Sequence, residues 1–311
     1  MGAGITTISA EPLRIVSYNV ENLFHPKHDT VMVDSTVTEK DDWAWTPNGE
    51  RRWSYTRYYR KVESIARVLT NAGGWNGIDI AGLQEVENAE CVKRLCHTLR
   101  KGEYGFVHYE SPDRRGIDVA LIYKKARIDT LATKAIPVPQ LETRDILYVC
   151  AKTAKQDTLH LFVCHLPSQR GGAAESEWKR KIAKHVLQSA VDSLYTQDPQ
   201  AKIIIMGDFN GTPKDDITGM RNRMNEHGRK LQRTMGTHKY QGQWTCLDQF
   251  YTSPAVDTIS KVWIYDAEWL QEEDEKYLGL KPKRMYNGFR YQKDGFSDHL
   301  PIVLEIEDST R

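Results

Sequence analysis

Apolar residues in this chain fall into two patterns that alternate along its length. Short runs rich in β-branched and aliphatic residues are typical of buried strands. We expect strands over residues 106–109, 119–123, 148–151, 159–164, 201–206, 247–251 and 301–306. Three longer segments, residues 55–69, 89–99 and 175–194, repeat apolar residues at helical spacing, and Pro199 follows the last of them as a stop signal. The alternation predicts a mixed α/β chain whose sheets are covered by helices.

Polar residues of a few particular types flank the apolar runs. The clearest case is Ile203-Ile204-Ile205, which leads through Met206 and Gly207 to Asp208 and Asn210. A carboxylate at a strand end can take a proton from water, and an amide can hold that water in place. An ordinary Gly-Asp or Asn-Gly turn is the alternative. The other runs are flanked by Asn19, Glu21, Glu85, His165, Asp298 and His299, and Asp248 sits inside an apolar strand-like segment. This inventory suits a hard divalent cation and acid–base groups that act on a phosphoester.

An ordered set of short motifs resembles the endonuclease/exonuclease/phosphatase family (deoxyribonuclease I-like). The pieces that carry the resemblance are Ser17-Tyr18-Asn19-Val20-Glu21, Leu83-Gln84-Glu85-Val86, Arg115-Gly116-Ile117-Asp118-Val119-Ala120, Cys164-His165-Leu166-Pro167, Gly207-Asp208-Phe209-Asn210, Leu247-Asp248-Gln249 and Ser297-Asp298-His299. Each piece alone is weak, but together they fall in the family's order and span nearly the whole chain. The segments 115–123 and 239–250 look most like a subgroup from Bacteroides-type bacteria.

The resemblance implies a fold and a domain organisation. The family fold is a four-layer sandwich of two packed mixed β-sheets flanked by α-helices, with the active site at one edge of the sandwich. We expect one domain over residues 11–311, preceded by a tail over residues 1–10. The tail lacks the basic and apolar regions of a signal peptide. Export to the periplasm or outside the cell is expected if a signal peptide has been removed, and a cytoplasmic location otherwise.

The resemblance also implies a function. We expect a divalent-metal-dependent phosphoesterase that uses Mg²⁺, or Mn²⁺ in its place, and hydrolyses a phosphodiester or phosphomonoester by in-line attack of water. The partner is then a phosphoester substrate, either nucleic acid or a small phosphorylated molecule, because the family's core motifs do not separate these. The alternative is a catalytically silent binding module on the same fold. A structural protein without a site would leave the polar strand ends unexplained.

Matching the motifs assigns roles to individual residues. Glu85 is the expected main metal ligand, with Glu21 and Asp298 in support; a solvated acid at a helix start is the alternative for Glu85. Asp208 is the expected general base and Asn210 orients the water or holds the phosphate. His299 is expected to contact the phosphate, with its other ring nitrogen bonded to Asp248. The expected catalytic set is His165, Asp208, Asn210, Asp248 and His299.

Three further residues are expected to contact the substrate: Asn19, Arg115 and Arg170. Arg170-Gly171-Gly172 could cradle a phosphate through its guanidinium and backbone N–H groups, and a solvated loop is the alternative. Asp118 begins a strand and is expected to fix Arg115 or a neighbouring loop, with a turn acid as the alternative.

Charge and composition narrow the partners. Lys and Arg total 43 against 42 Asp and Glu, so the net charge of +1 favours small or single-stranded substrates over long duplex DNA. Five cysteines without a Cys-x-x-Cys pair argue against a structural zinc site. No apolar run has the length of a membrane span, and we expect a monomer without stable membrane insertion.

Residues 25–54 are polar, rich in tryptophan and without a period. A connection of this length is usually functional or disordered, and its tryptophans argue against disorder. Two interpretations stay open: a substrate-facing loop, or a surface flap that packs Trp43, Trp45 and Trp53 onto the body of the domain.

Overall fold

Two six-stranded mixed sheets form the centre of the molecule in this computed structural model, which describes residues 11–33, 36–169, 173–211, 217–224, 236–256 and 259–307. The first sheet has the strand order β15 (Ile259–Ile264), β20 (Ile302–Ile306), β1 (Leu13–Leu23), β4 (Ile80–Val86), β6 (Asp118–Lys124) and β5 (Tyr104–His108). The second has the order β11 (Arg221–Asn222), β14 (Asp248–Thr252), β10 (Lys202–Asp208), β9 (Thr158–His165), β8 (Ile146–Thr153) and β7 (Ile128–Ile136). Each sheet contains one parallel pair, β1 with β4 and β9 with β10, among antiparallel neighbours.

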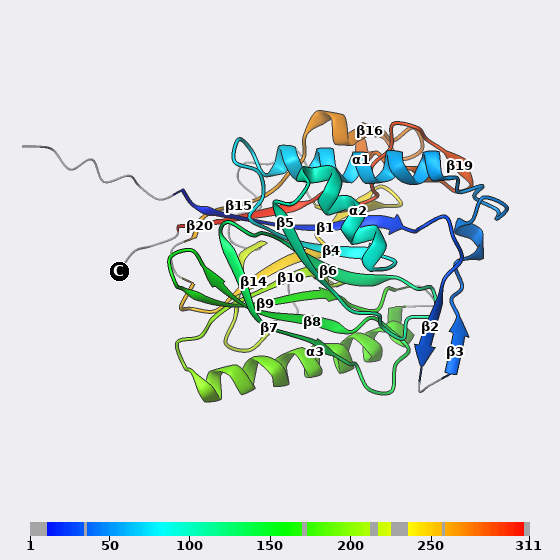
Figure 1. Cartoon of the computed structure of the whole chain (residues 1–311). Coiled ribbons are helices and arrows are strands. Elements are labelled where there is room, and N and C mark those ends of the chain that lie inside the picture. The colour runs from blue at the N-terminus through cyan, green and yellow to red at the C-terminus, as the bar shows by residue number, and fades with distance from the viewer. Residues whose placement is uncertain are drawn as a thin grey trace, which may run out of the picture.

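Helices cover the outer faces of both sheets. Helices α1 (Tyr55–Ala72) and α2 (Ala89–Arg100) lie over the first sheet, and α3 (Ala173–Gln197) runs beneath the second (Figure 1). Smaller elements decorate this frame, namely the pairs β2 (Thr30–Val33) with β3 (Thr36–Glu39), β12 (His238–Tyr240) with β13 (Gln243–Thr245), β16 (Gln271–Glu273) with β17 (Leu280–Pro282) and β18 (Tyr286–Asn287) with β19 (Arg290–Tyr291), and the 3-10 turns η1 (Trp43–Trp45) and η2 (Glu268–Leu270). The predicted four-layer fold is therefore confirmed.

The two sheets pack directly on each other through a close approach at Gly82. A side chain there would meet Met206 Sδ at 2.6 Å, so the glycine of β4 lets β10 of the other sheet come close. A second buried cluster joins the outer face of the second sheet to α3 through residues such as Leu187 and Ile203. These two cores bury nearly all the apolar runs that the sequence shows.

Capping explains where the first two helices begin. The Ser54 side chain accepts a hydrogen bond from the Arg57 N–H, and the Asn88 side chain accepts one from the Cys91 N–H at 3.0 Å. Only Glu87 separates the end of β4 from the cap Asn88. This short link holds Glu85 at the edge of the sheet. The predicted helices and strands are confirmed with ends that shift by a few residues.

The tryptophan-rich segment 25–54 packs most of its aromatic rings onto the domain. Trp53 is fully buried, and Trp45 is 9% exposed and stacks on Phe24 with ring centroids 5.0 Å apart. Trp43 differs, because it is 55% exposed and stacks on His28 at 3.7 Å. The flap interpretation thus holds for two of the three tryptophans, and Trp43 stays available to a ligand.

Single tryptophan variants should separate these two roles. We expect Trp45→Ala to lower the free energy of unfolding by about 2 kcal/mol, because a largely buried ring is removed from the edge of the core. Trp43→Ala should leave stability within about 0.5 kcal/mol. Urea denaturation measures both, and equal losses for the two variants would contradict the assignment.

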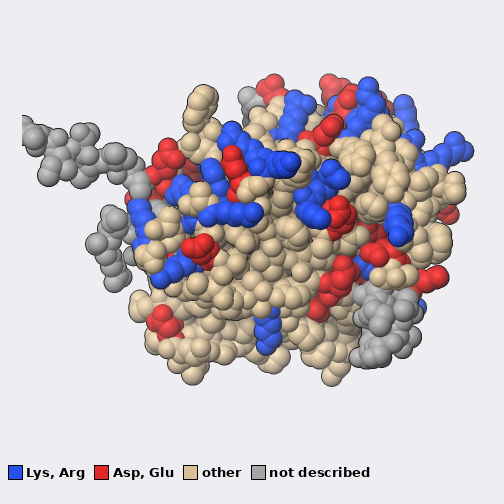
Figure 2. All heavy atoms as spheres, viewed as in Figure 1, with Lys and Arg blue, Asp and Glu red and all other residues tan. Residues whose placement is uncertain are grey.

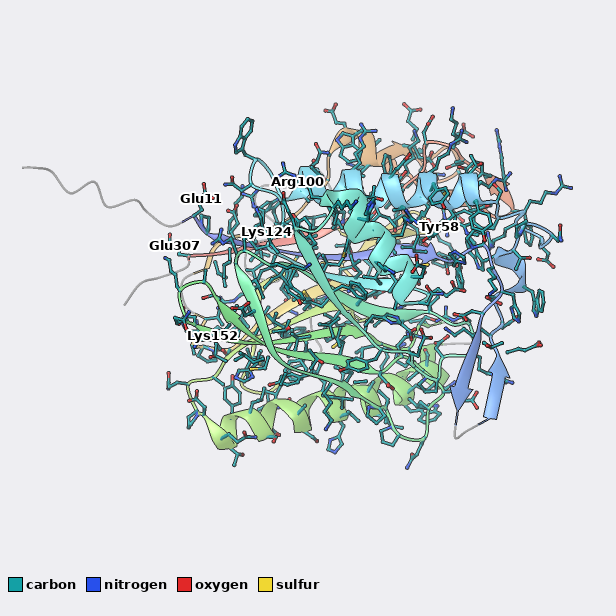
Figure 3. The ribbon with its side chains drawn as sticks, in the orientation of Figure 1. Glu11, Tyr58, Arg100, Lys124, Lys152 and Glu307 are labelled. Atoms are coloured by element: carbon teal, nitrogen blue, oxygen red, sulfur yellow. The ribbon has the colours of Figure 1, made fainter. Side chains whose placement is uncertain are left out.

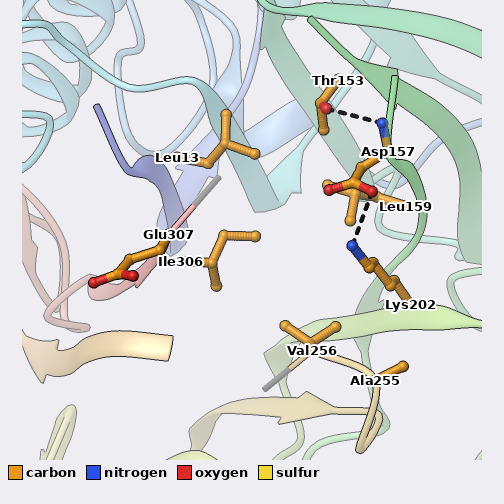
Figure 4. A pocket seen from close by; sticks show the side chains of 9 residues that line it. All are labelled: Leu13, Thr153, Asp157, Leu159, Lys202, Ala255, Val256, Ile306 and Glu307. Carbon is orange, nitrogen blue, oxygen red and sulfur yellow. Dashed lines mark hydrogen bonds and ion pairs between the residues drawn. The ribbon is translucent and has the colours of Figure 1, made fainter. Parts of the chain in front are cut away.

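The two ends of the sheets differ in character. Glu11, Lys152 and Glu307 lie at one end of the molecule, whereas Tyr58 lies toward the other (Figure 3). A cavity of about 20 Å³ at the first end is lined by the starts of β1, β9 and β10, and Lys202 Nζ there lies 2.9 Å from Asp157 Oδ1 (Figure 4). It is too small for a substrate. The polar strand ends lie at the opposite end of these same strands.

Candidate active site

The register of the second sheet aligns three predicted catalytic residues in one row. Asp208 at the end of β10 pairs with His165 of β9 on one side and with Asp248 of β14 on the other. Gly207 makes the row possible, because a Cβ at this position would meet the Cys164 carbonyl oxygen at 1.9 Å and its φ of +144° disfavours other residues. Regular strand pairing, with one close approach between Gly207 and Cys164, therefore places Asp208 at the strand end as predicted.

The first sheet contributes Asn19, Glu21 and Glu85 through two irregular strand ends. The pairing of β1 with β4 shifts register after Asn19, and the pairing of β4 with β6 shifts after Gln84. Glu21 and Glu85 both have left-handed backbone conformations, with φ of +53° and +65°. Strained residues of this kind gather at functional sites, and a bulge re-aims a side chain at a sheet edge. The Asn22 N–H donates to Glu85 Oε2 at 3.1 Å and ties the two strand ends together.

Asp208 is the residue at which the two sheets meet. Asn19 Nδ2 donates to Asp208 Oδ2 at 3.1 Å, and the Asn210 N–H donates to Asp208 Oδ1 at 2.8 Å. Asn210 Nδ2 donates to the Leu166 carbonyl at 3.0 Å and so holds its own loop. Burial raises the pKa of Asp208 to about 6, against the opposing effect of His299. A carboxylate with a pKa close to neutrality is well matched to proton abstraction from water.

His299 is held by Asp248 as the sequence analysis predicts. His299 Nδ1 lies 2.8 Å from Asp248 Oδ2, and its Nε2 lies 3.8 Å from Asp208 Oδ2. Burial opposes a charge on this ring, but the carboxylates of Asp248 and Asp208 raise the pKa of His299 well above its usual value. The ring is therefore an imidazolium near neutral pH, which can neutralise charge on a phosphoryl group.

His165 lies between the predicted base and the predicted metal ligand. Its Nε2 is 3.6 Å from Asp208 Oδ2 and 3.9 Å from Glu85 Oε1. The buried Arg144 holds the loop after His165, because its Nε and Nη2 donate to the carbonyls of His165 and Leu166 at 3.1 and 2.8 Å. Sequence reasoning missed Arg144, since an arginine outside every motif gives no sign of its burial.

Arg284 binds two of the three predicted metal ligands, Glu21 and Asp298, and no sequence pattern pointed to this arginine. Its Nε donates to Glu21 Oε1 at 2.8 Å, and its Nη2 lies 3.1 Å from Asp298 Oδ2. Burial raises the pKa of Asp298, but Arg284 and His299 outweigh it and lower the pKa to about 2. Burial and Asp298 raise the pKa of Glu21 to about 7. Buried Lys61, whose Nζ donates to the Phe296 carbonyl, is a second unforeseen cation near these acids.

Removing the Arg284 charge should make stability depend more steeply on pH. In Arg284→Met, Glu21 and Asp298 lose their shared cation, so the pKa of Glu21 in the folded state rises further above its unfolded value. A raised carboxyl pKa costs stability above the unfolded pKa, and the cost grows as pH rises. We expect the variant to lose about 1 kcal/mol more at pH 8 than at pH 5, measured by urea denaturation. A pH-independent loss would contradict this pairing.

The structure fits a divalent cation at Glu21 and Glu85. Glu21 Oε2 is buried and finds no hydrogen-bond partner among the residues that the structure describes, although a buried carboxylate oxygen normally has one. Glu85 and Glu21 both offer oxygens, the ligands that Mg²⁺ prefers, and one or two carboxylates suffice for it. Arg284 binds Asp298 and also the other oxygen of Glu21, Oε1. The metal roles of these three residues stay predictions.

Two of the expected substrate contacts lie away from the catalytic row or outside the described residues. Arg115 lines a pocket of about 510 Å³ beside Pro167 and Trp178, where its Nε lies 3.3 Å from Asp113 Oδ1. Arg170 falls outside the described part of the chain. Asn19 contacts Asp208 and takes part in positioning the base.

Asp118 does not hold Arg115, contrary to the first of the two expectations for it. It accepts a hydrogen bond from the Ser111 N–H at 3.0 Å and lies 3.3 Å from His108 Nε2, so it fixes the loop that follows β5. Asp118, His108 and Glu110 form the one close group of three potential His, Cys, Asp or Glu metal ligands found among the described residues. Lys40 already neutralises Glu110 through an ion pair.

Comparison with known proteins agrees with this fold. A sequence model of the endonuclease/exonuclease/phosphatase family matches residues 14–308. Among solved structures, a family member from Bacteroides thetaiotaomicron has 15% identity and a TM-score of 0.59 over 95% of this chain and 97% of its own. Truncated TDP2 from Caenorhabditis elegans has 17% identity and a TM-score of 0.62 over 95% and 97% of the two chains.

A mannosyl-6-phosphatase from Bacteroides thetaiotaomicron has 14% identity and a TM-score of 0.60 over 94% of this chain and 99% of its own. No curated protein sequence matches the chain. At these identities the solved structures support the fold, and the family match covers nearly all of the sequence. The chain belongs to the endonuclease/exonuclease/phosphatase family.

Proposed function

We propose that this protein is a divalent-metal-dependent phosphoesterase that hydrolyses a phosphodiester or phosphomonoester by in-line attack of water. Phosphoesterase chemistry follows from the family, and the metal and the mechanism are the proposal. The observation that carries it is the position of Asp208, whose carboxylate lies within 4 Å of Asn19, His165 and His299. A general base (Asp208), a positively charged ring (His299) and hydrogen-bonding side chains (Asn19 and His165) thus lie close together, as hydrolysis of a phosphoester requires.

Each residue of the site has a separate role in the proposed reaction. Asp208 takes the proton of the attacking water, while Asn19 and Asn210 keep its carboxylate in place through their hydrogen bonds. His299, fixed by Asp248, neutralises the charge that grows on the phosphoryl oxygens. His165 is placed to assist the leaving oxygen. A Mg²⁺ held by Glu85 and Glu21 would add electrostatic stabilisation of the phosphoryl group.

Neutral net charge and the known neighbours leave the substrate open between nucleic acid and a small phosphorylated molecule. One solved neighbour is named a mannosyl-6-phosphatase and others are TDP2. Fold and central residues are shared across such activities, and substrate choice depends on the loops. A monomeric state and export of the protein stay predictions from the sequence.

The proposal is tested by hydrolysis of a substrate panel in the presence of Mg²⁺, with Asp208→Asn as the control. The panel holds bis-p-nitrophenyl phosphate, single- and double-stranded DNA, abasic DNA, inositol phosphates, a hexose 6-phosphate and sphingomyelin. We expect turnover of at least one phosphoester that the variant lacks. Intact folding without turnover of any member would favour the silent binding module instead.

A further inference from the structure

A basic groove runs beside the active site, between α1 and the segment 269–296. Its volume is about 530 Å³. The charged side chains that line it are Arg60, Arg67, Lys283 and Lys293 against Glu63 and Asp294. We use the name basic groove for this feature.

Among the described residues, the four cations of the basic groove form no close ion pairs, and they outnumber the two acids Glu63 and Asp294 that line it with them. In the described part of the chain, no ion pair within 4.0 Å joins any of its four cations to a carboxylate. The pocket beside Pro167 and Trp178 is the opposite case, because Asp113 there pairs with both Arg115 and Arg144. Unpaired cations that converge on a concave surface concentrate positive potential and attract anions. The groove therefore has the charge of an anion site, and the pocket beside Pro167 and Trp178 does not.

The groove is held in shape by ring stacking and backbone hydrogen bonds. The guanidinium of Arg67 lies 4.5 Å from the centre of the Trp269 ring, which limits the positions it can adopt. The Lys283 N–H donates to the Leu270 carbonyl at 2.8 Å, and the Phe296 N–H donates to the Lys283 carbonyl at 2.6 Å. These contacts hold in place the backbone segments and the ring that carry and orient the cations.

Two backbone segments, 283–284 and 296–299, contribute residues to both the groove and the active site. Lys283 is followed by Arg284, which binds Glu21 and Asp298, and Phe296 is followed by Ser297, Asp298 and His299. Lys61 of α1 joins the two regions through its bond to the Phe296 carbonyl. On the face shown in Figure 2, Lys and Arg gather over the half that carries α1 and α2 in Figure 1, and few charges lie over the second sheet. The segments 283–284 and 296–299 therefore lie between the groove and the active site and contribute residues to both.

We propose that the basic groove binds a second phosphate group of the substrate, one that is not cleaved, and that the substrate is a single-stranded nucleic acid. This inference rests on the proposed function. A nucleic-acid strand carries a phosphate at every nucleotide, so a strand cleaved at Asp208 places further phosphates beside the site, where the groove cations can displace the counterions bound to the strand. A sugar monophosphate would leave all four cations unused. The net charge of +1 agrees with a local contact and not with a long duplex interface.

The inference is tested with a charge-reversed groove and a matched control. The groove variant is Arg67→Glu with Lys293→Glu, and a second variant, Arg60→Glu with Lys293→Glu, leaves the Arg67–Trp269 stack intact. The control reverses two cations on the second sheet and its turn, Lys134→Glu with Lys155→Glu, at the same change in net charge. Each is assayed on a 12-nucleotide oligothymidylate and on bis-p-nitrophenyl phosphate, which has a single phosphate.

We expect both groove variants to lose at least about tenfold in kcat/KM on the oligonucleotide and to keep their rate on the small diester. The control should keep both rates. Binding without catalysis is measured by fluorescence anisotropy of the oligonucleotide in EDTA, on the Asp208→Asn background. The slope of log Kd against log salt should fall by about 0.7 for each phosphate contact that a groove variant removes.

Failure of the groove inference can be told apart from failure of the proposed function. If the wild-type protein hydrolyses the small diester but neither binds nor cleaves the oligonucleotide, the groove inference is wrong and the proposed function stands. Equal weakening by the control pair, or an equal loss on the small diester, would also overturn it. If neither substrate is hydrolysed the proposed function fails, and the anisotropy experiment still decides whether the groove binds a strand.

Discussion

Replacing Asp208 by asparagine is expected to lower kcat by at least about 10² while the fold is kept. Asparagine has nearly the same shape and its single amide oxygen can still accept from either Asn19 or the Asn210 N–H, but it cannot accept a proton from water. The loss should appear in kcat more than in KM, because the proton is transferred only in the transition state. Steady-state kinetics on any substrate found active measures it, with circular dichroism as the folding control.

The pH profile gives an independent view of the same residue. Since burial raises the pKa of Asp208 to about 6, the wild-type rate should fall as pH drops through about 6 and the base becomes protonated. The residual activity of Asp208→Asn should lack this acid limb. Near-normal turnover in the variant, or an unchanged acid limb, would show that another group takes the proton.

Replacing His299 by alanine is expected to cost at least about 10² in kcat for a different reason. His299 carries a positive charge because Asp248 and Asp208 outweigh the effect of burial on its pKa. Alanine removes this charge and leaves Asp248 buried without its partner. Loss of one preorganised electrostatic group from such a site has an effect of this size. Kinetics together with thermal denaturation separate the catalytic loss from a loss of fold.

Asp248→Asn provides the matched test of how His299 works. Asparagine keeps the hydrogen bond to Nδ1 possible but removes the carboxylate that raises the pKa of His299. The ring should then lose its proton at lower pH, so the activity of this variant should fall at a lower pH on the alkaline side than that of the wild type. An alkaline limb that does not move would argue that the charge of His299 is not used.

Sequence reasoning reached the catalytic row because each of its members follows or begins an apolar strand. The pattern alone placed Asp208 and His165 at strand ends and Asp248 within a strand, and strand register brings the three together. The pairing of Asp248 with His299 was implied by the family resemblance, and it explains why a carboxylate lies inside an apolar run, where it needs a partner. The family resemblance supplied the order of the sheets, which local patterns do not determine.

Residues outside the motifs could not be found in this way. Arg284 and Lys61 come from a loop and a helix whose sequence patterns show only a surface segment and an amphipathic face. Arg284 nevertheless binds Glu21, and Lys61 lies close enough for the charge of Glu21 to act on it. Their positions depend on how segments more than 200 residues apart pack, as in the contact of Arg284 with Glu21 across 263 positions. Trp45 and Trp53 were ambiguous for the same reason, since a tryptophan-rich loop fits either a ligand or a core.

The measurement that tests the central claim most directly is hydrolysis of bis-p-nitrophenyl phosphate by the wild-type protein in Mg²⁺ and in EDTA. The small diester needs neither the basic groove nor the pocket beside Pro167 and Trp178, so it reports on the Asp208 centre alone. We predict turnover that EDTA abolishes, that added Mg²⁺ restores and that Asp208→Asn lacks. Turnover that is equal in EDTA and in Mg²⁺, or that survives in Asp208→Asn, would contradict a metal-dependent phosphoesterase built around Asp208.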